Sequence, residues 1–163
     1  MKITAQEEYG IRILLRIADS KSPDGITIPR LSDVEGLSAH YTAKLCRILR
    51  LNGFIRSTRG KEGGYFLARP ASEININHVL TVLGGKLYSE DFCKTHTGQL
   101  QDCCHKCSCS VRSLWQVLQQ AVDEILNNYT LQDLLNSENG IEALSVPDFR
   151  KIPELSELQK SDN

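Results

Sequence analysis

The chain has 163 residues, of which 40% are hydrophobic and 24% charged, the balance of an ordinary globular protein. No apolar run approaches the ~20 residues that a membrane-spanning helix needs. The first ten residues include Glu7 and Glu8, so they do not resemble an apolar signal segment. We therefore expect a cytoplasmic protein without a membrane partner.

The formal net charge of −1 hides an asymmetry along the chain. Residues 1–70 carry twelve Lys and Arg against seven Asp and Glu, a net charge of +5, so the remainder carries −6. Between Ser38 and Arg69 there are seven basic residues and one acidic residue, Glu62. A basic patch in a nearly neutral chain favours a polyanion site, and a merely solvated basic surface is the alternative.

The first predicted element is an amphipathic helix over residues 3–19. Apolar residues recur there at helical spacing, and Thr4 with Glu7 forms a plausible capping box. A turn is expected at residues 22–25, followed by a short extended segment at 26–29.

Two further helices are predicted close together. The first covers about residues 30–35 and ends at Gly36. The second has Ser38 as its N-cap and stops before residues 52–53. Two helices joined by a short turn that contains glycine form a helix-turn-helix.

A β-hairpin follows directly. Residues 54–58 and 65–68 are rich in β-branched and aromatic side chains, and the Gly-rich turn 59–64 separates them. A hairpin placed immediately after a helix-turn-helix is typical of a wing. Another helix is expected over residues 72–84.

The second half of the chain contains a polar loop and a long helix. Residues 89–109 show no apolar periodicity, and a loop of that length is usually functional or disordered. From Val111 a wide apolar stripe runs to Tyr129, more than a small winged domain needs. We interpret the excess as a homodimer interface, with packing on its own domain as the alternative. Thr130 is expected to cap a short last helix, and residues 137–163 to form a polar tail.

The second helix of the pair is the candidate DNA-reading helix. Its first residues would face base edges in the major groove, and cations one and two turns later would contact phosphates. Ser38 has a second role as a helix cap. The selected residues are Ser38, His40, Tyr41, Lys44 and Arg47.

The turn of the hairpin supplies two more cations. Arg59 and Lys61 stand among glycines that let the backbone approach closely. An arginine at such a tip can enter a narrow minor groove, and a solvated turn residue is the alternative reading of Arg59.

Five of the six cysteines fall within 17 residues, between Cys93 and Cys109, whereas Cys46 stands alone. Iron–sulfur clusters and zinc both take thiolate ligands from such loops. One paired knuckle, Cys104 with Cys107, is the spacing common in zinc sites. His96 and His105 are further ligand candidates, and free cysteines without metal remain an alternative.

Two other classes of function are alternatives to a DNA-binding protein. A metal- or redox-handling protein, with the winged domain as an interaction module, would also explain the cysteines. An enzyme is disfavoured, because the chain shows neither a nucleophile–base pair nor a phosphate or dinucleotide fingerprint. The glycines at 60–64 lie between strands and not before a helix, so they are no phosphate cradle.

Several motifs carry a family resemblance that covers about residues 1–136. They are Tyr9-Gly10-Ile11-Arg12, Ser38-Ala39-His40-Tyr41, Arg59-Gly60-Lys61-Glu62-Gly63-Gly64-Tyr65-Phe66-Leu67 and Asn128-Tyr129-Thr130-Leu131-Gln132-Asp133-Leu134. With these motifs the chain resembles the Rrf2 family of winged-helix transcription regulators, which includes iron–sulfur sensors of the IscR and NsrR type. The resemblance implies a homodimer that binds double-stranded DNA.

The resemblance also implies an iron–sulfur cluster, with 2Fe–2S as the expected type. Aligned from Trp115, the three cysteine ligands correspond to Cys109, Cys103 and Cys93. The gap before Cys103 is longer than in the typical members, which leaves Cys104 and Cys107 as substitutes. Some members bind no cluster, so zinc or no metal stays open.

The fourth ligand departs from one pattern of the family. IscR-like members have a histidine three positions after the third cysteine, where this chain has Arg112, which cannot ligate. NsrR-like members use an acidic residue of the first helix, donated by the partner subunit, and this position corresponds to Glu8. A carboxylate is a weaker ligand for iron than a thiolate, which suits a sensor.

The expected fold class is mainly α with a small β-hairpin: a winged helix-turn-helix domain, a Cys-rich loop and a long dimerisation helix. The expected boundaries are residues 1–84 for the DNA-binding domain, 85–110 for the cluster loop, 111–136 for the dimerisation region and 137–163 for the tail. The expected function is transcription regulation tuned by the cluster.

Overall fold

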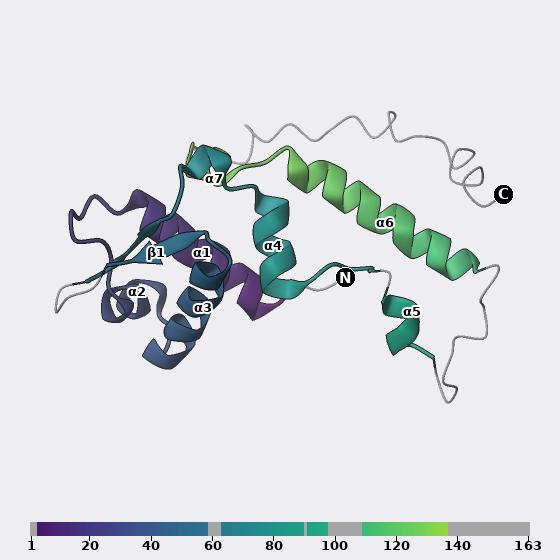
Figure 1. Ribbon diagram of the computed structural model, residues 1–163, viewed down its shortest axis with the longest axis horizontal. Coiled ribbons are helices and arrows are strands. Elements are labelled where there is room, and N and C mark those ends of the chain that lie inside the picture. Colours follow the sequence, from purple (N-terminus) through teal and green to yellow (C-terminus); the bar gives the residue numbers. More distant parts are fainter. Residues whose placement is uncertain (1–2, 59–62, 90, 98–108, 137–163) are drawn as a thin grey trace.

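The computed structural model describes residues 3–58, 63–89, 91–97 and 109–136 (Figure 1). A helical core carries a small hairpin at one end, and a long helix extends from the other end. The elements are α1 (Ala5–Asp19), α2 (Ile28–Glu35), α3 (Ala39–Leu51), β1 (Ile55–Ser57), β2 (Tyr65–Leu67), the 3-10 helix η1 (Ala71–Glu73), α4 (Ile76–Gly84), α5 (Phe92–Thr95), α6 (Ser110–Asn127) and α7 (Leu131–Asn136). The mainly helical fold class with one hairpin is confirmed.

Helix α1 forms the centre of the core. The predicted capping box is present, because the Thr4 side chain accepts from the Glu7 amide and the Glu7 carboxylate accepts from the Thr4 amide at 2.7 Å. One face of the helix is buried, including Ile13 and Leu14, both fully inaccessible to solvent. Helices α2, α3, α4 and α7 all contact it.

Helix α2 begins at Ile28, two residues before the predicted start. The prediction of an extended segment is therefore wrong for residues 28–29, which are helical. The Thr27 side chain accepts from the Arg30 amide, and Pro29 lies in the first turn. Proline is favoured there, because its fixed φ suits a helix and its missing N–H needs no partner. Gly36 ends the helix at φ 66°, a left-handed conformation that favours glycine.

Helix α3 packs against α2 as the second half of the predicted helix-turn-helix. Ser38 is its N-cap, and its hydroxyl accepts from the Tyr41 amide at 3.2 Å. The buried Ser32 hydroxyl lies 3.2 Å from the Thr42 hydroxyl, so the two helices share a hydrogen bond inside their interface. Leu45 fills the core behind them.

A buried carboxylate ties α2 to α1. The Glu35 side chain is 1% exposed, and its two oxygens accept from Arg12 Nε at 2.7 Å and Arg16 Nε at 2.6 Å. Burial alone would raise the pKa of Glu35, but the hydrogen bonds and charges of Arg16 and Arg12 outweigh it, so the pKa is lowered. The ionised form is therefore the stable form of this anchor.

Strands β1 and β2 pair antiparallel, with Ser57 opposite Tyr65, as the wing prediction requires. The hairpin is held against the loop before α2 by a bridge between Ile26 and Tyr65, whose amides and carbonyls bond at 2.9 and 3.2 Å. A Cβ on Gly64 would lie 2.5 Å from the Asp24 carbonyl oxygen, so only glycine allows this approach. The turn of the hairpin lies outside the described residues.

The helix predicted at 72–84 is two elements, η1 and α4. They are separated because the Asn75 side chain accepts from the His78 amide and so starts a new helix. Helix α4 crosses α1 at Gly10, where a Cβ would overlap the side chain of Leu83. The loop predicted at 89–109 contains the short helix α5. Its four residues are too few to show a helical repeat of apolar side chains in the sequence.

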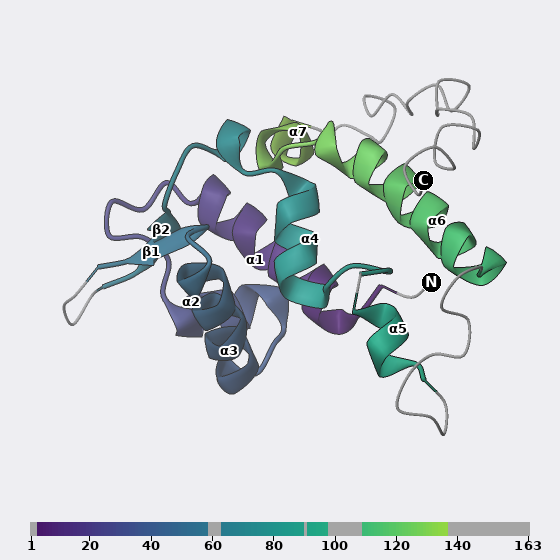
Figure 2. The same cartoon turned by 45° about the vertical axis from the view of Figure 1, so that its right-hand side comes forward.

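Helix α6 connects two different environments. Its C-terminal end continues to α7, where Leu131 is fully buried. Thr130 caps α7 as predicted, because its hydroxyl accepts from the Asp133 amide at 3.4 Å. Its N-terminal end projects away from the winged core in both views (Figures 1 and 2). Four large apolar side chains are 40–56% exposed on it: Val111, Leu114, Trp115 and Leu118.

Within the ranges that the structure describes, no helix is both long enough and apolar enough to cross a bilayer.

Replacing Glu35 with glutamine should lower the free energy of unfolding at pH 7 by about 1–3 kcal/mol, because two arginines lose their charged acceptor. The lower part of this range is expected, since both arginines are about half exposed and can be hydrated. Urea unfolding of wild type and Glu35→Gln measures the difference. Asp33→Asn, at an exposed position of the same helix, should change stability by less than about 0.5 kcal/mol.

The same pair gives a pH test. Because the folded pKa of Glu35 is lowered, its contribution is present above the unfolded value, about 4.3, and is lost as pH falls through the folded value. The stability difference between wild type and Glu35→Gln should therefore shrink under acid. A difference that stays constant down to the acid transition would contradict the ion-pair account.

Candidate nucleic-acid interface and metal centre

Helix α3 presents a basic face to solvent. Its opposite face, with Leu45, Cys46 and Leu49, is fully buried. Of the residues selected from the sequence, Tyr41 is half-buried, and the exposed ones are Ser38, His40, Lys44 and Arg47. The structure thus brings the five predicted α3 residues onto or beside one open surface.

Two of these residues are positioned by their neighbours. The Tyr41 ring meets the Tyr9 ring of α1 edge-on at 6.3 Å, and Lys44 Nζ lies 5.9 Å from the centre of the Tyr41 ring. The Ser38 hydroxyl is engaged as the helix cap, which leaves its own hydrogen free to donate. The start of α3 is therefore a preformed surface, supported by α1.

The wing contributes an exposed cation that sequence reasoning missed. Arg56 lies on β1, and its guanidinium carbon is 5.0 Å from the centre of the Phe66 ring. The alternation of the strand could have identified it, since Ile55 is buried and Arg56 faces the other side. The predicted wing-tip cations, Arg59 and Lys61, lie outside the described residues.

The three cysteines that the structure describes differ in accessibility. Cys46 is fully buried in α3, and burial raises its pKa to about 11, so it is unsuited to bind a metal. Cys93 on α5 and Cys109 at the start of α6 are partly exposed. Cys103, Cys104 and Cys107, together with His105, lie outside the described residues.

Cys93 and Cys109 both lie near two other side chains, Arg112 and Tyr88. Cys109 is the N-cap of α6, and its sulfur accepts from the Arg112 amide at 3.4 Å. The Arg112 guanidinium bonds with the Cys93 sulfur, and this bond raises the pKa of Arg112. The pKa of the Tyr88 hydroxyl is raised, chiefly because the hydroxyl is desolvated. The nearby charge of Cys93 and a hydrogen bond with Cys93 raise it further.

This arrangement fits part of an iron–sulfur or zinc site. It places two soft sulfur donors, from α5 and from the start of α6, beside the same guanidinium. Among the described residues no group of three or more His, Cys, Asp and Glu forms a metal site by itself. His96 is the C-cap of α5, and its ring stacks on the Phe92 ring with the ring centres 3.9 Å apart.

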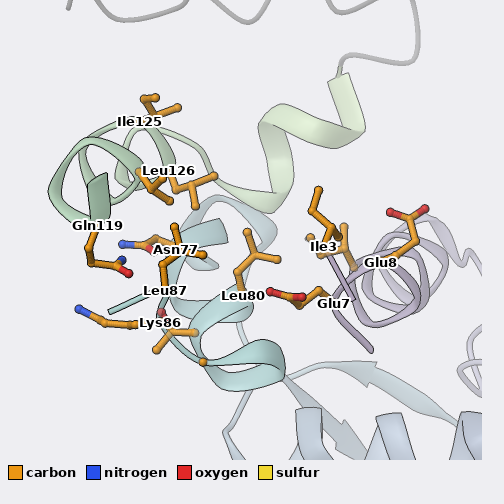
Figure 3. Close-up of a pocket in the computed structure, with 14 residues that line it drawn as sticks. Ile3, Glu7, Glu8, Asn77, Leu80, Lys86, Leu87, Gln119, Ile125 and Leu126 are labelled. Atoms are coloured by element: carbon orange, nitrogen blue, oxygen red, sulfur yellow. The ribbon is translucent and has the colours of Figure 1, made fainter. Parts of the chain in front are cut away.

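The remaining predicted ligand, Glu8, lies elsewhere on the surface. It is exposed and lines an apolar groove of about 350 Å³ between α1, α4 and α6 (Figure 3). Within the described part of this chain, the side chains found against Cys93 are Tyr88 and Arg112. One copy of the chain thus brings Cys93 and Cys109 together, without Glu8.

The chain is similar to known proteins over most of its length. The Rrf2 family profile, described as an iron-dependent transcriptional regulator, matches residues 3–137. The protein rrf2 of Nitratidesulfovibrio vulgaris (strain Hildenborough) is 35% identical over 136 residues, which are 83% of this chain and 87% of that protein.

Solved structures show the same fold. IscR of T. potens has a TM-score of 0.65 at 25% identity, over 93% of this chain and 97% of that one. CymR, the global cysteine regulator of B. subtilis, has a TM-score of 0.62 at 27% identity, over 83% and 97%. On the profile match, the sequence identity and the winged fold together, the chain belongs to the Rrf2 family and is a DNA-binding transcriptional regulator rather than an enzyme.

Proposed function

We propose that this regulator works as a homodimer that reads a specific operator and whose affinity is tuned by an iron–sulfur cluster, of the 2Fe–2S type. The observation that carries the DNA-reading part is the exposed basic face of α3 beside a wing. Ser38, His40 and Tyr41 would face base edges, because they begin the helix that enters the major groove. Lys44 and Arg47 would bind phosphates, and Arg59 and Lys61 would contact the minor groove from the wing tip.

The proposed dimer rests on α6. Its exposed stripe includes Trp115, 40% exposed, and Leu114, 53% exposed, on a helix that projects from the core. Apolar side chains gathered on one helix face gain free energy when a second copy covers them. Two copies would also give the DNA-binding surface two-fold symmetry, which suits a palindromic operator.

The proposed cluster ligands are Cys93, Cys103 and Cys109, with Glu8 of the second subunit as the fourth. The position of Cys93 and Cys109 near the same two side chains, Arg112 and Tyr88, supports the sulfur ligands, and the iron dependence named for the family supports the metal. An iron–sulfur cluster supplies redox chemistry and can be lost, which suits sensing of oxidants, iron or nitric oxide. Arg112 would stabilise the anionic sulfurs by hydrogen bonding, and Glu8 would tie α1 of one subunit to the loop of the other.

Arg47→Ala and Lys44→Ala should each weaken operator binding and reduce the slope of log affinity against log salt concentration by about one. Each removes one phosphate contact, so the loss should be similar on specific and random duplexes. Fluorescence anisotropy of cluster-free protein at several salt concentrations measures both. Lys94→Ala, on α5 at the opposite end of the molecule, is the control, and an equal loss there would contradict the assignment.

Leu114→Glu and Leu118→Glu should convert the dimer to a monomer, because each would place a charge in the apolar interface. Sedimentation velocity measures the mass directly. Gln120→Glu, at an exposed position of the same helix, should stay dimeric. A monomeric wild type, or dimeric variants at both leucines, would overturn the α6 interface.

Cys93→Ala and Cys109→Ala should each abolish the visible absorption of anaerobically purified protein and reduce bound iron to background. Glu8→Ala should retain the three sulfur ligands but lose the effect of the cluster on operator affinity. Cys46→Ala is the control, since this buried residue should not affect iron content. Zinc instead of iron, or dependence on Cys104 and Cys107 in place of Cys93 and Cys103, would replace the proposed centre by another one.

A further inference from the structure

Gln119 is a buried polar residue on a helix that is otherwise open. It is 8% exposed and is the one residue of α6, a helix that the structure describes throughout, that is buried. A leucine of similar size would bury more apolar surface at this position. An amide can remain there without cost only if both its donor and its acceptor are satisfied.

Both polar ends of Gln119 are used, and they point to different parts of the chain. Its oxygen accepts from the Tyr88 amide at 3.1 Å. Its nitrogen donates to Asp123 Oδ1 at 2.8 Å, and the same oxygen accepts from Asn77 Nδ2 of α4 at 3.0 Å. Figure 3 shows Gln119 beside Asn77 and Lys86, on the side of the groove remote from Glu8.

One end of this chain of contacts reaches the cysteine site. The Tyr88 side chain hydrogen-bonds with Cys93, and its ring lies 5.6 Å from the ring of Phe92 on α5. The backbone of Tyr88 is thus held by Gln119, while its hydroxyl is held by Cys93. A change at Cys93 therefore acts on a residue that Gln119 fixes.

The other end reaches the wing. Asn77 lies in the first turn of α4, and its neighbour His78 packs its ring 4.9 Å from that of Phe54. Phe54 is fully buried at the start of the hairpin, and its carbonyl accepts from the Ala68 amide at 2.9 Å. Helix α4 is therefore in contact with Phe54, the residue that directly precedes β1 of the wing.

We propose that Gln119 is the positioning residue that couples the state of Cys93 to the winged domain, through Tyr88 on one side and Asp123 and Asn77 on the other. The proposal rests on the proposed sensing function. Ligation of the Cys93 sulfur changes its bond with the Tyr88 hydroxyl and moves the Tyr88 backbone. Gln119 passes that movement to Asp123, whose Oδ1 accepts both from Gln119 and from Asn77 of α4.

The first test compares operator affinity of cluster-loaded and cluster-free protein. Coupling of this kind gives an affinity ratio of about 5–150 in wild type. Gln119→Leu should retain the cluster absorbance and the cluster-free affinity, while the ratio falls to about 1–2. Gln120→Leu, the same change at the adjacent exposed position, should keep the full ratio.

A rescue variant separates coupling from simple loss of structure. Gln119→Glu combined with Asp123→Asn exchanges donor and acceptor, and it still provides an acceptor for the Tyr88 amide. This double variant should recover most of the affinity ratio. A full ratio in Gln119→Leu, or no recovery in the double variant, would overturn the role of Gln119.

The second test needs no cluster and uses amide hydrogen exchange of cluster-free protein. Gln119→Leu should speed exchange of the Tyr88 amide about tenfold, the effect of one lost hydrogen bond. Cys93→Ala should alter protection of α4 in the wild-type background and not in the Gln119→Leu background. If wild type binds no cluster, the proposed sensing function fails. The exchange data still test the coupling: if Cys93→Ala changes the amide protection of α4 equally in both backgrounds, the role of Gln119 is refuted.

Discussion

The orientation of the reading helix depends on a single buried carboxylate. Glu35 closes the end of α2 against Arg12 and Arg16 of α1, so the helix that supports α3 cannot slide along the core without separating three charges. The Ser32–Thr42 bond then fixes α3 on α2. The basic surface of α3 is thus oriented by contacts that lie behind it.

The wing is separated in space from the two partly exposed cysteines, Cys93 and Cys109. The wing lies at one end and α5 with the start of α6 at the other, with α4 between them (Figure 2). Polar contacts join α4 to α6, where Asp123 accepts from both Asn77 and Gln119. Individual bonds of this kind contribute about 1 kcal/mol, so a small number of them matches the coupling energies of known allosteric proteins, about 1–3 kcal/mol.

Local patterns in the sequence predicted the elements well, because their causes are local. The Thr4–Glu7 box, the Ser38 cap and the hairpin after α3 each depend on residues a few positions apart. The start of α2 was misplaced, since Thr27 and Pro29 together form a helix start that resembles an extended segment.

The candidate site was predictable only in part. Sequence spacing identified Cys93 and Cys109 as candidates, but the contacts of Arg112 and Tyr88 with Cys93 arise from the packing of α5 against α6. Gln119 was invisible for the same reason: a glutamine in an amphipathic helix looks like a solvent-facing residue until the backbone of a distant segment is placed over it.

Cys46 divides the thiols of the chain into two chemical classes. It lies in the reading helix, yet its sulfur is inaccessible, and with a pKa of about 11 it stays protonated at neutral pH. Thiolates that solvent can reach react with peroxide and other electrophiles, so burial and protonation together protect the Cys46 sulfur from them. Helix α3 can therefore hold a cysteine in its packed face without exposing an oxidisable sulfur there.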